Sequence, residues 1–84
     1  MNIYVGNLDF KVKEKDLEGI FEDYGKVNSV KIITDKYSGR SKGFGFVEME
    51  NNDDAVKAIK ELNGATVENR EIVVNEARPK RKDY

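Results

Sequence analysis

Apolar and polar residues alternate in four short segments of this chain, which is the pattern of a β-strand with one buried face. The segments span residues 2–6, 27–34, 42–49 and 70–75. One side of them is aliphatic and carries Ile3, Val5, Val30, Ile32, Val47, Met49, Ile72 and Val74. The other side is mixed and carries Tyr4, Ser29, Lys31, Ile33, Phe44, Phe46, Glu48, Val73 and Asn75. We therefore predict four strands whose aliphatic sides face a common core.

Two further segments show the helical period, in which apolar residues recur at i, i+3, i+4 and i+7. The first spans about residues 14–24 and carries Leu17, Ile20, Phe21 and Tyr24. The second spans about residues 53–62 and carries Ala55, Ala58, Ile59 and Leu62. Gly25 and Gly64 are placed to end the two helices. Asn51 or Asn52 can cap the start of the second helix, whereas the first lacks a good N-cap residue.

The order strand, helix, strand, strand, helix, strand predicts an α+β fold. It is a two-layer, ferredoxin-like βαββαβ sandwich, with a four-stranded antiparallel sheet and both helices on one face. Helices with a single apolar stripe cover the aliphatic face of such a sheet and leave the other face open. Tyr4, Phe44 and Phe46 then gather on the open face. A contiguous exposed apolar patch usually marks an interaction site, so these aromatics are the first candidate functional residues.

The composition removes several classes of function. The 84 residues suffice for one domain with a single modest core. Cys and His are both absent, so we expect no metal, no cofactor and no enzymatic activity, although carboxylate chemistry stays open. No apolar run approaches the roughly 18 residues of a membrane span, so we expect no membrane partner and a cytoplasmic location.

The net charge of -1 argues weakly against a nucleic-acid partner, because such domains are often basic. The charges are unevenly distributed, however. Residues 14–23 hold five acids and one base, whereas residues 31–42 hold four bases and one acid. Residues 78–84 again hold four bases and one acid. These segments are either parts of an electrostatic footprint or ordinary solvated faces, and the sequence leaves both interpretations open.

Two motifs resemble the signatures of the RNA recognition motif family. They are Ile3-Tyr4-Val5-Gly6-Asn7-Leu8 and, about forty residues later, KGFGFVEM at residues 42–49. The octapeptide meets the family pattern at seven of eight positions. The exception is Met49, which by alternation faces the helices and should affect packing alone. The chain is similar to small single-domain bacterial members and to plant glycine-rich RNA-binding proteins, without their glycine-rich tail.

The resemblance implies a role for each matching residue. Tyr4, Phe44 and Phe46 would stack on bases or ribose, and Lys42 would meet phosphate. Asn75, Glu76, Ala77 and Arg78 would offer groups to base edges, and Asn7, Ser29 and Lys31 would lie beside them. Further phosphate contacts, or merely solvated charges, are Lys36, Arg40, Lys80, Arg81 and Lys82. The resemblance places the domain at residues 1–78, followed by a short basic tail at residues 79–84.

Three classes of function follow from these patterns. The first is a monomeric module that binds single-stranded RNA, or single-stranded DNA, since stacking does not distinguish the sugars. The second is a protein-interaction domain on the same fold, which the retained aromatics disfavour. The third is a small enzyme of similar architecture, supported by fold analogy alone.

Overall fold

A computed structural model describes residues 1–34, 37–39 and 41–77 of the chain. Its elements are β1 (Asn2–Gly6), α1 (Glu14–Glu22), β2 (Val27–Thr34), β3 (Ser41–Met49), α2 (Asn52–Leu62), β4 (Thr66–Val67), β5 (Arg70–Glu71) and β6 (Val73–Glu76). The expected order of strands and helices is confirmed. A small hairpin, β4 and β5, is added between α2 and β6.

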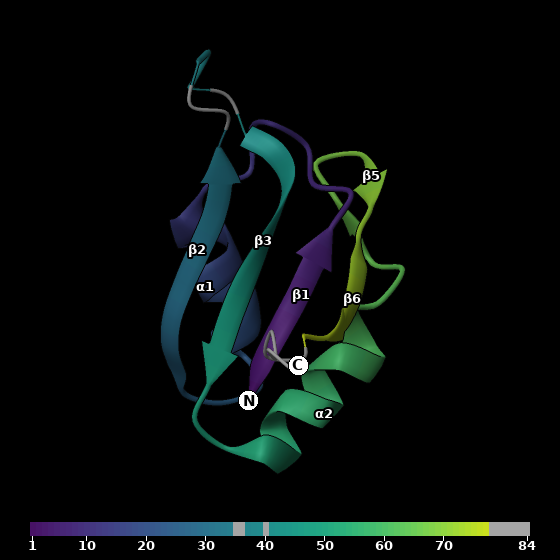
Figure 1. Cartoon of the computed structure of the whole chain (residues 1–84). Coiled ribbons are helices and arrows are strands. Elements are labelled where there is room, and N and C mark those ends of the chain that lie inside the picture. The colour runs from purple at the N-terminus through teal and green to yellow at the C-terminus, as the bar shows by residue number, and fades with distance from the viewer. Residues whose placement is uncertain (35–36, 40, 78–84) are drawn as a thin grey trace, which may run out of the picture.

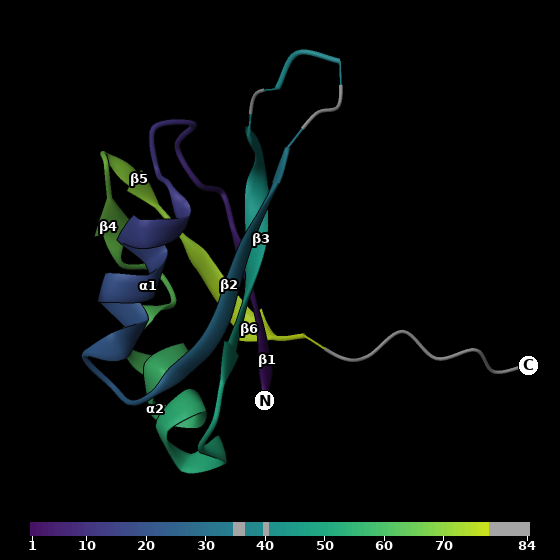
Figure 2. The same cartoon turned by 90° about the vertical axis from the view of Figure 1, so that its left-hand side faces the viewer.

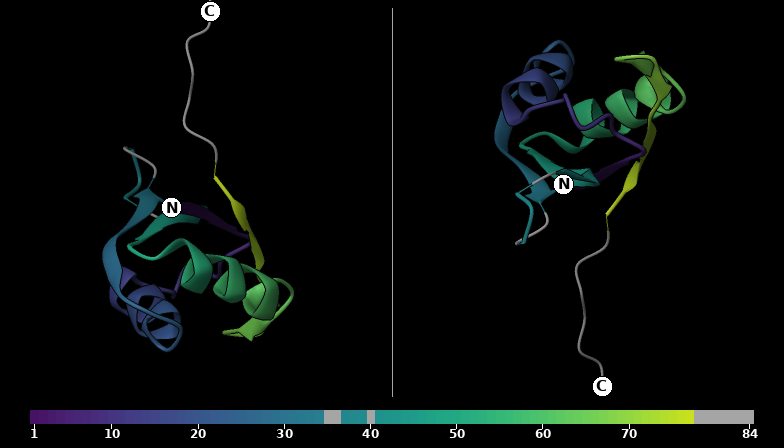
Figure 3. Two further views of the ribbon diagram at one scale, coloured as in Figure 1. Left: turned by 90° about the horizontal axis from the view of Figure 1, so that it is seen from below. Right: turned by 90° about the horizontal axis from the view of Figure 1, so that it is seen from above.

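The main sheet has the strand order β2-β3-β1-β6, with antiparallel pairing throughout (Figure 1). Both helices and the β4–β5 hairpin lie on one side of this sheet, and no described helix or strand covers its other side (Figure 2). Views along the sheet show the same two layers (Figure 3). The predicted α+β sandwich with one open face is therefore confirmed.

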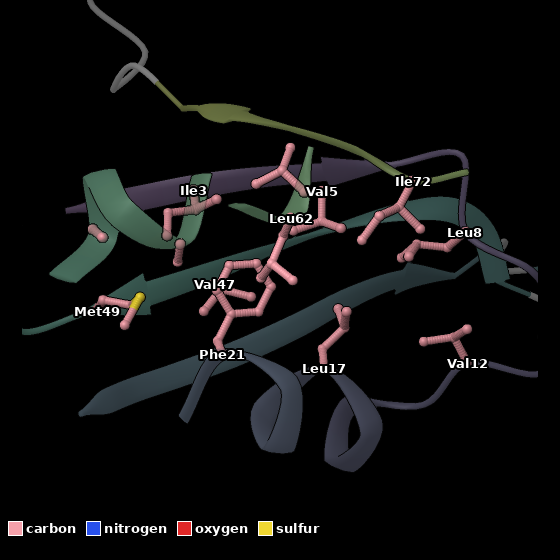
Figure 4. Close-up of a cluster of buried hydrophobic side chains, with 13 residues drawn as sticks. Ile3, Val5, Leu8, Val12, Leu17, Phe21, Val47, Met49, Leu62 and Ile72 are labelled. Carbon is pink, nitrogen blue, oxygen red and sulfur yellow. The ribbon is translucent and has the colours of Figure 1, made fainter. Parts of the chain in front are cut away.

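The core lies between the sheet and the helices (Figure 4). The aliphatic sides of the strands supply Ile3, Val5, Val47, Met49, Ile72 and Val74, and the helices supply Leu17, Phe21, Ala55, Ala58 and Leu62. Each of these side chains is at most 8% exposed, so the predicted face assignment is confirmed. The sequence patterns missed Leu8 and Val12, which are buried although they lie in the segment between β1 and α1.

The bounds of the helices differ slightly from the prediction. The first helix, α1, ends at Glu22 instead of Tyr24, because the Tyr24 N–H already turns back to the Phe21 carbonyl (3.0 Å). The start of α1 is stabilised by Asp16 in its first turn. The Asp16 carboxylate accepts a hydrogen bond from the backbone N–H of the N-cap residue Lys13 (2.9 Å). The second helix begins one residue earlier than expected.

The predicted strand at residues 70–75 is divided in two. Ile72 lies between β5 and β6, and its backbone N–H donates to the Ala65 carbonyl (2.9 Å). β5 thus pairs with β4, and β6 pairs with β1. Glu68 and Asn69 make the tight hairpin turn with φ values of 51° and 71°, as a two-residue turn of this kind requires. The alternation continues across the break, so Ile72 still enters the core.

Within the described part of the chain, no helix has the length and apolarity needed to cross a membrane.

Candidate nucleic-acid interface

The strand register arranges the side chains of the open face in rows that cross the sheet. Tyr4 pairs with Phe46 on one side and with Asn75 on the other, and Phe46 in turn pairs with Lys31. Directly opposed residues of a sheet share a face. The central row, from β2 to β6, is therefore Lys31, Phe46, Tyr4 and Asn75, two rings flanked by a cation and an amide.

The three predicted aromatics form one cluster. Ring centroids lie 5.9 Å apart for Tyr4 and Phe46, 6.0 Å for Tyr4 and Phe44, and 6.2 Å for Phe44 and Phe46. These separations fall within the range of favourable aromatic pairs, about 4.5 to 7 Å. Tyr4 and Phe44 are half-buried, whereas Phe46 is 38% exposed. The rings thus support one another while remaining accessible from the open face.

Gly6 makes room for this cluster. It lies on the open face, paired with Phe44 on one side and with Val73 on the other. A Cβ atom built at Gly6 would lie 2.8 Å from Cε2 and Cζ of the Tyr4 ring. The Tyr4 ring therefore extends along β1 over Gly6, in the space that a side chain there would occupy. The sequence patterns placed this glycine in the first motif without assigning it a role.

A polar row lies next to the aromatic one. Glu48 pairs with Ser29 across β2 and with Asn2 across β1, and Ala77 donates its N–H to the Asn2 carbonyl (2.9 Å). The Ser29 hydroxyl donates to Glu48 Oε1 (3.4 Å). These residues line a hollow of about 530 Å³ together with Lys31, Phe46 and Val47. Sequence reasoning placed Glu48 on this face without assigning it a role.

Asn7 lies at the end of β1, and its amide serves the fold. Its backbone is in the left-handed region, with φ of 58°. Its Nδ2 donates to the Glu71 carbonyl (2.7 Å), and its Oδ1 accepts from Arg70 Nη2 (2.9 Å). Asn7 therefore links the end of β1 to the β4–β5 hairpin. Any RNA contact predicted for its side chain would compete with these two hydrogen bonds.

The remaining predicted residues divide into two sets. Lys31 and Asn75 are exposed in the central row, and Ala77 is half-buried at the hollow. Lys42 belongs to β3, but its side chain is outside the described residues. Also outside them are Lys36, Arg40, Arg78, Lys80, Arg81 and Lys82.

The helix α1, whose first turn carries Glu14 and Asp16, lies in the layer behind the sheet (Figure 2). Glu14 faces β2, where its carboxylate accepts a hydrogen bond from the Ile32 backbone N–H (3.2 Å). The part of the negative charge that α1 carries is therefore behind the sheet. The described residues contain no group of three or more acidic side chains placed to hold a metal ion.

Known proteins resemble this chain over nearly its whole length. It is 46% identical over 80 residues to the "Putative RNA-binding protein RbpA" of Synechocystis sp., covering 95% of this chain and 79% of that protein. The crystal structure of RNA Binding Protein PG1 superposes with a TM-score of 0.92 at 50% identity, covering 98% of this chain and 99% of that one. The Sxl-lethal protein/RNA complex superposes with a TM-score of 0.89 at 34% identity, covering 96% of this chain and 48% of that one.

The family model described as RNA recognition motif matches residues 3–73. The match spans every strand of the main sheet, although it ends within β6, and it includes both sequence motifs and the three clustered rings. The single deviation from the octapeptide pattern, Met49, is fully buried beneath the helices and leaves the open face unchanged. The chain belongs to the RNA recognition motif family.

Proposed function

We propose that the open face of the sheet binds single-stranded RNA, with unpaired bases stacked on Tyr4, Phe44 and Phe46. The observation that carries this proposal is the cluster of three rings on a sheet face that no described element covers. Exposed rings on a sheet hold splayed bases by about 1 to 3 kcal/mol each. The names of the relatives support RNA as the ligand: RbpA and PG1 are called RNA-binding proteins, and the Sxl-lethal structure is a complex with RNA.

The proposal assigns the neighbouring polar groups to the rest of the nucleotide. Lys31 stands beside Phe46 in the central row, where its ammonium group can donate to a nucleotide stacked there. Asn75 and Ala77 stand on the other side of Tyr4 and Asn2, where they can contact base edges. We assign Asn7, Arg40, Lys42 and Arg78 to the same interface on the strength of the family resemblance.

The proposal also covers the organisation of the protein. Residues 1–78 are the binding domain and residues 79–84 are a basic tail. The protein acts as a monomer in the cytoplasm and has no enzymatic activity. The absence of cysteine supports a reducing compartment, and the absence of histidine supports a binding role.

The first test is the substitution Phe46→Ala, assayed by fluorescence anisotropy with a labelled short RNA of random sequence. We expect the affinity to fall by about 5- to 150-fold, the equivalent of one lost stack of about 1 to 3 kcal/mol. Because Phe46 is 38% exposed and outside the core, the melting temperature should stay near that of the unchanged protein.

The control is Phe10→Ala, which removes another exposed phenylalanine, one that lies outside the sheet, in the segment before α1. It should leave the affinity unchanged. Equal losses of RNA affinity from Phe46→Ala and Phe10→Ala would contradict the proposal that the open face binds RNA. An unfolded Phe46→Ala protein would contradict it as well. Single-stranded DNA and duplex RNA of matched sequence complete the assay, and the duplex should bind much more weakly because its bases are unavailable for stacking.

A further inference from the structure

Glu48 is a carboxylate on the face that we propose binds a polyanion. It lies on the same side of β3 as Phe46, two residues further along the strand, so the two side chains are about 7 Å apart. Its charge repels phosphate, and none of the roles assigned above uses it. A carboxylate in this position is productive only if the ligand brings hydrogen-bond donors to it.

Within the described residues, the carboxylate of Glu48 keeps unused acceptor capacity. Ser29 donates one hydrogen bond to Oε1 (3.4 Å). In the part of the chain that the structure describes, Glu48 forms no salt bridge, whereas its neighbour Glu50 pairs with Lys26. An ionised carboxylate has about four lone-pair sites, and one hydroxyl occupies one of them. The group can therefore accept two more hydrogen bonds from a ligand.

The hollow beside Glu48 has the size and lining of a site for a nucleobase. Its volume of about 530 Å³ lies within the range of small-molecule sites, about 300 to 1,000 Å³. Phe46 supplies an aromatic wall, Lys31 a cation, and Asn2 and Ser29 polar groups. A base that stacks on Phe46 can thus turn its hydrogen-bonding edge toward Glu48.

We propose that this hollow selects guanine, and that Glu48 is the residue that reads it. Guanine alone presents two adjacent donors, N1–H and N2–H, which match the two oxygens of a carboxylate. Adenine and cytosine place a ring-nitrogen acceptor next to their amino group, and uracil flanks its single N–H with two carbonyls. In those bases at least one carboxylate oxygen would face another acceptor.

Lys31 completes the pattern. The third group on the same edge of guanine is the acceptor O6, beside N1–H. Lys31 lines the hollow together with Glu48 and can donate to that oxygen. The edge of guanine reads acceptor, donor, donor, and the hollow offers a cation followed by a carboxylate. Ser29 lines the same hollow, and its hydroxyl lies 3.4 Å from Glu48 Oε1.

This inference rests on the proposed RNA-binding function, and a probe series tests the two separately. Labelled short oligouridines carry one central guanine, adenine, cytosine or inosine, and a uridine-only strand is the reference. The unchanged protein should bind the guanine strand about tenfold or more tightly than the other natural strands, the discrimination expected of one bidentate pair. Inosine keeps N1–H and O6 but lacks the N2 amino group, so its strand should have intermediate affinity.

The variant Glu48→Gln keeps the shape of the side chain and replaces one of its two acceptor oxygens by an amide NH2 group. It should lose the guanine preference while binding the uridine-only strand as tightly as before or more tightly. The control Glu61→Gln makes the same change of charge on the exposed face of α2, in the opposite layer, and should keep the preference. Circular dichroism melts establish that both variants are folded.

The outcomes distinguish the two levels of the proposal. Binding to none of the strands would overturn the RNA-binding function and the guanine site together. Equal binding to all strands, or an unchanged guanine preference in a folded Glu48→Gln protein, would overturn the guanine site and leave RNA binding intact. If Glu48→Gln fails to fold, the inosine strand still tests the site, since affinity equal to that of guanine would exclude a bidentate contact.

Discussion

At the scale of single residues, the accessible rings depend on a position that has no side chain. The Tyr4 ring lies along β1 over Gly6, at the centre of the open face. The backbone of Gly6 is outside the left-handed region, so the need for glycine there is a matter of space and not of backbone strain. Gly6 is therefore part of the binding surface through the position that it allows Tyr4 to take.

The substitution Gly6→Ala tests this role. The added methyl group must displace the far end of the Tyr4 side chain, which is free to move toward solvent, so the fold should persist. In anisotropy titrations, we expect the free energy of RNA binding to weaken by at most that of one base–aromatic stack, about 1 to 3 kcal/mol. The control Gly19→Ala adds a methyl group that points into open space on α1, and should leave affinity unchanged. An unshifted affinity for Gly6→Ala would show that the ring position is not critical.

At the scale of elements, α2 begins with a complete set of local signals. Asn51 is the N-cap, with extended backbone, and its Oδ1 accepts a hydrogen bond from the Asp54 N–H (3.0 Å). Asp53 and Asp54 place negative charge in the first turn, where the helix dipole favours it. This start was predicted to within one residue, with Asn51 as one of two candidate caps, because every signal for it lies within a few residues of the sequence.

Replacing this cap should change stability without changing function. Asn51→Ala should lower the free energy of unfolding by about 1 kcal/mol, measured by urea denaturation. RNA affinity should be unchanged, because α2 lies in the layer behind the sheet (Figure 2). Asn52→Ala alters the same residue type one position later, inside the helix, where alanine is favourable, and should cost nothing. Equal destabilisation by both substitutions would argue against a capping role for Asn51.

At the scale of the whole molecule, a net charge of -1 does not describe the charge that a ligand meets on the open face. The acids of α1 are exposed behind the sheet, where they lie away from a ligand on the open face. Because exposed charges are screened over about 8 to 10 Å in physiological salt, the sign near the ligand matters more than the total. A nearly neutral protein can therefore still bind RNA with a salt-dependent affinity.

The salt dependence offers a test of the basic tail. Substituting Lys80, Arg81 and Lys82 together by alanine should reduce the slope of log affinity against log salt by about 2, since each phosphate contact to a single strand contributes about 0.7. The control replaces Lys15, Lys57 and Lys60 in the two helices, which removes the same charge from the layer behind the sheet. An unchanged slope for the tail variant would mean that these residues make no phosphate contact.

The sequence predicted the faces of the strands well and the irregular segments poorly. Alternation identified Ile3 as core and Phe46 as exposed, because the period of a strand is a local property of the backbone. Leu8 and Val12 were missed as core residues, since burial outside a regular element depends on what packs over it. The break at Ile72 was missed because the alternation continues through it, while its hydrogen bonds turn to Ala65.

The amino-acid sequence by itself determined which side chains share a face, and hence that three rings stand on the side opposite the helices. Only the tertiary structure determined which side chains meet across the strands. The hollow brings together Asn2, Ser29 and Glu48, which are far apart in the chain and become neighbours through the register of β1, β2 and β3. Register follows from long-range pairing and close packing of the core, so no local pattern contains it. The candidate guanine site is a product of that register.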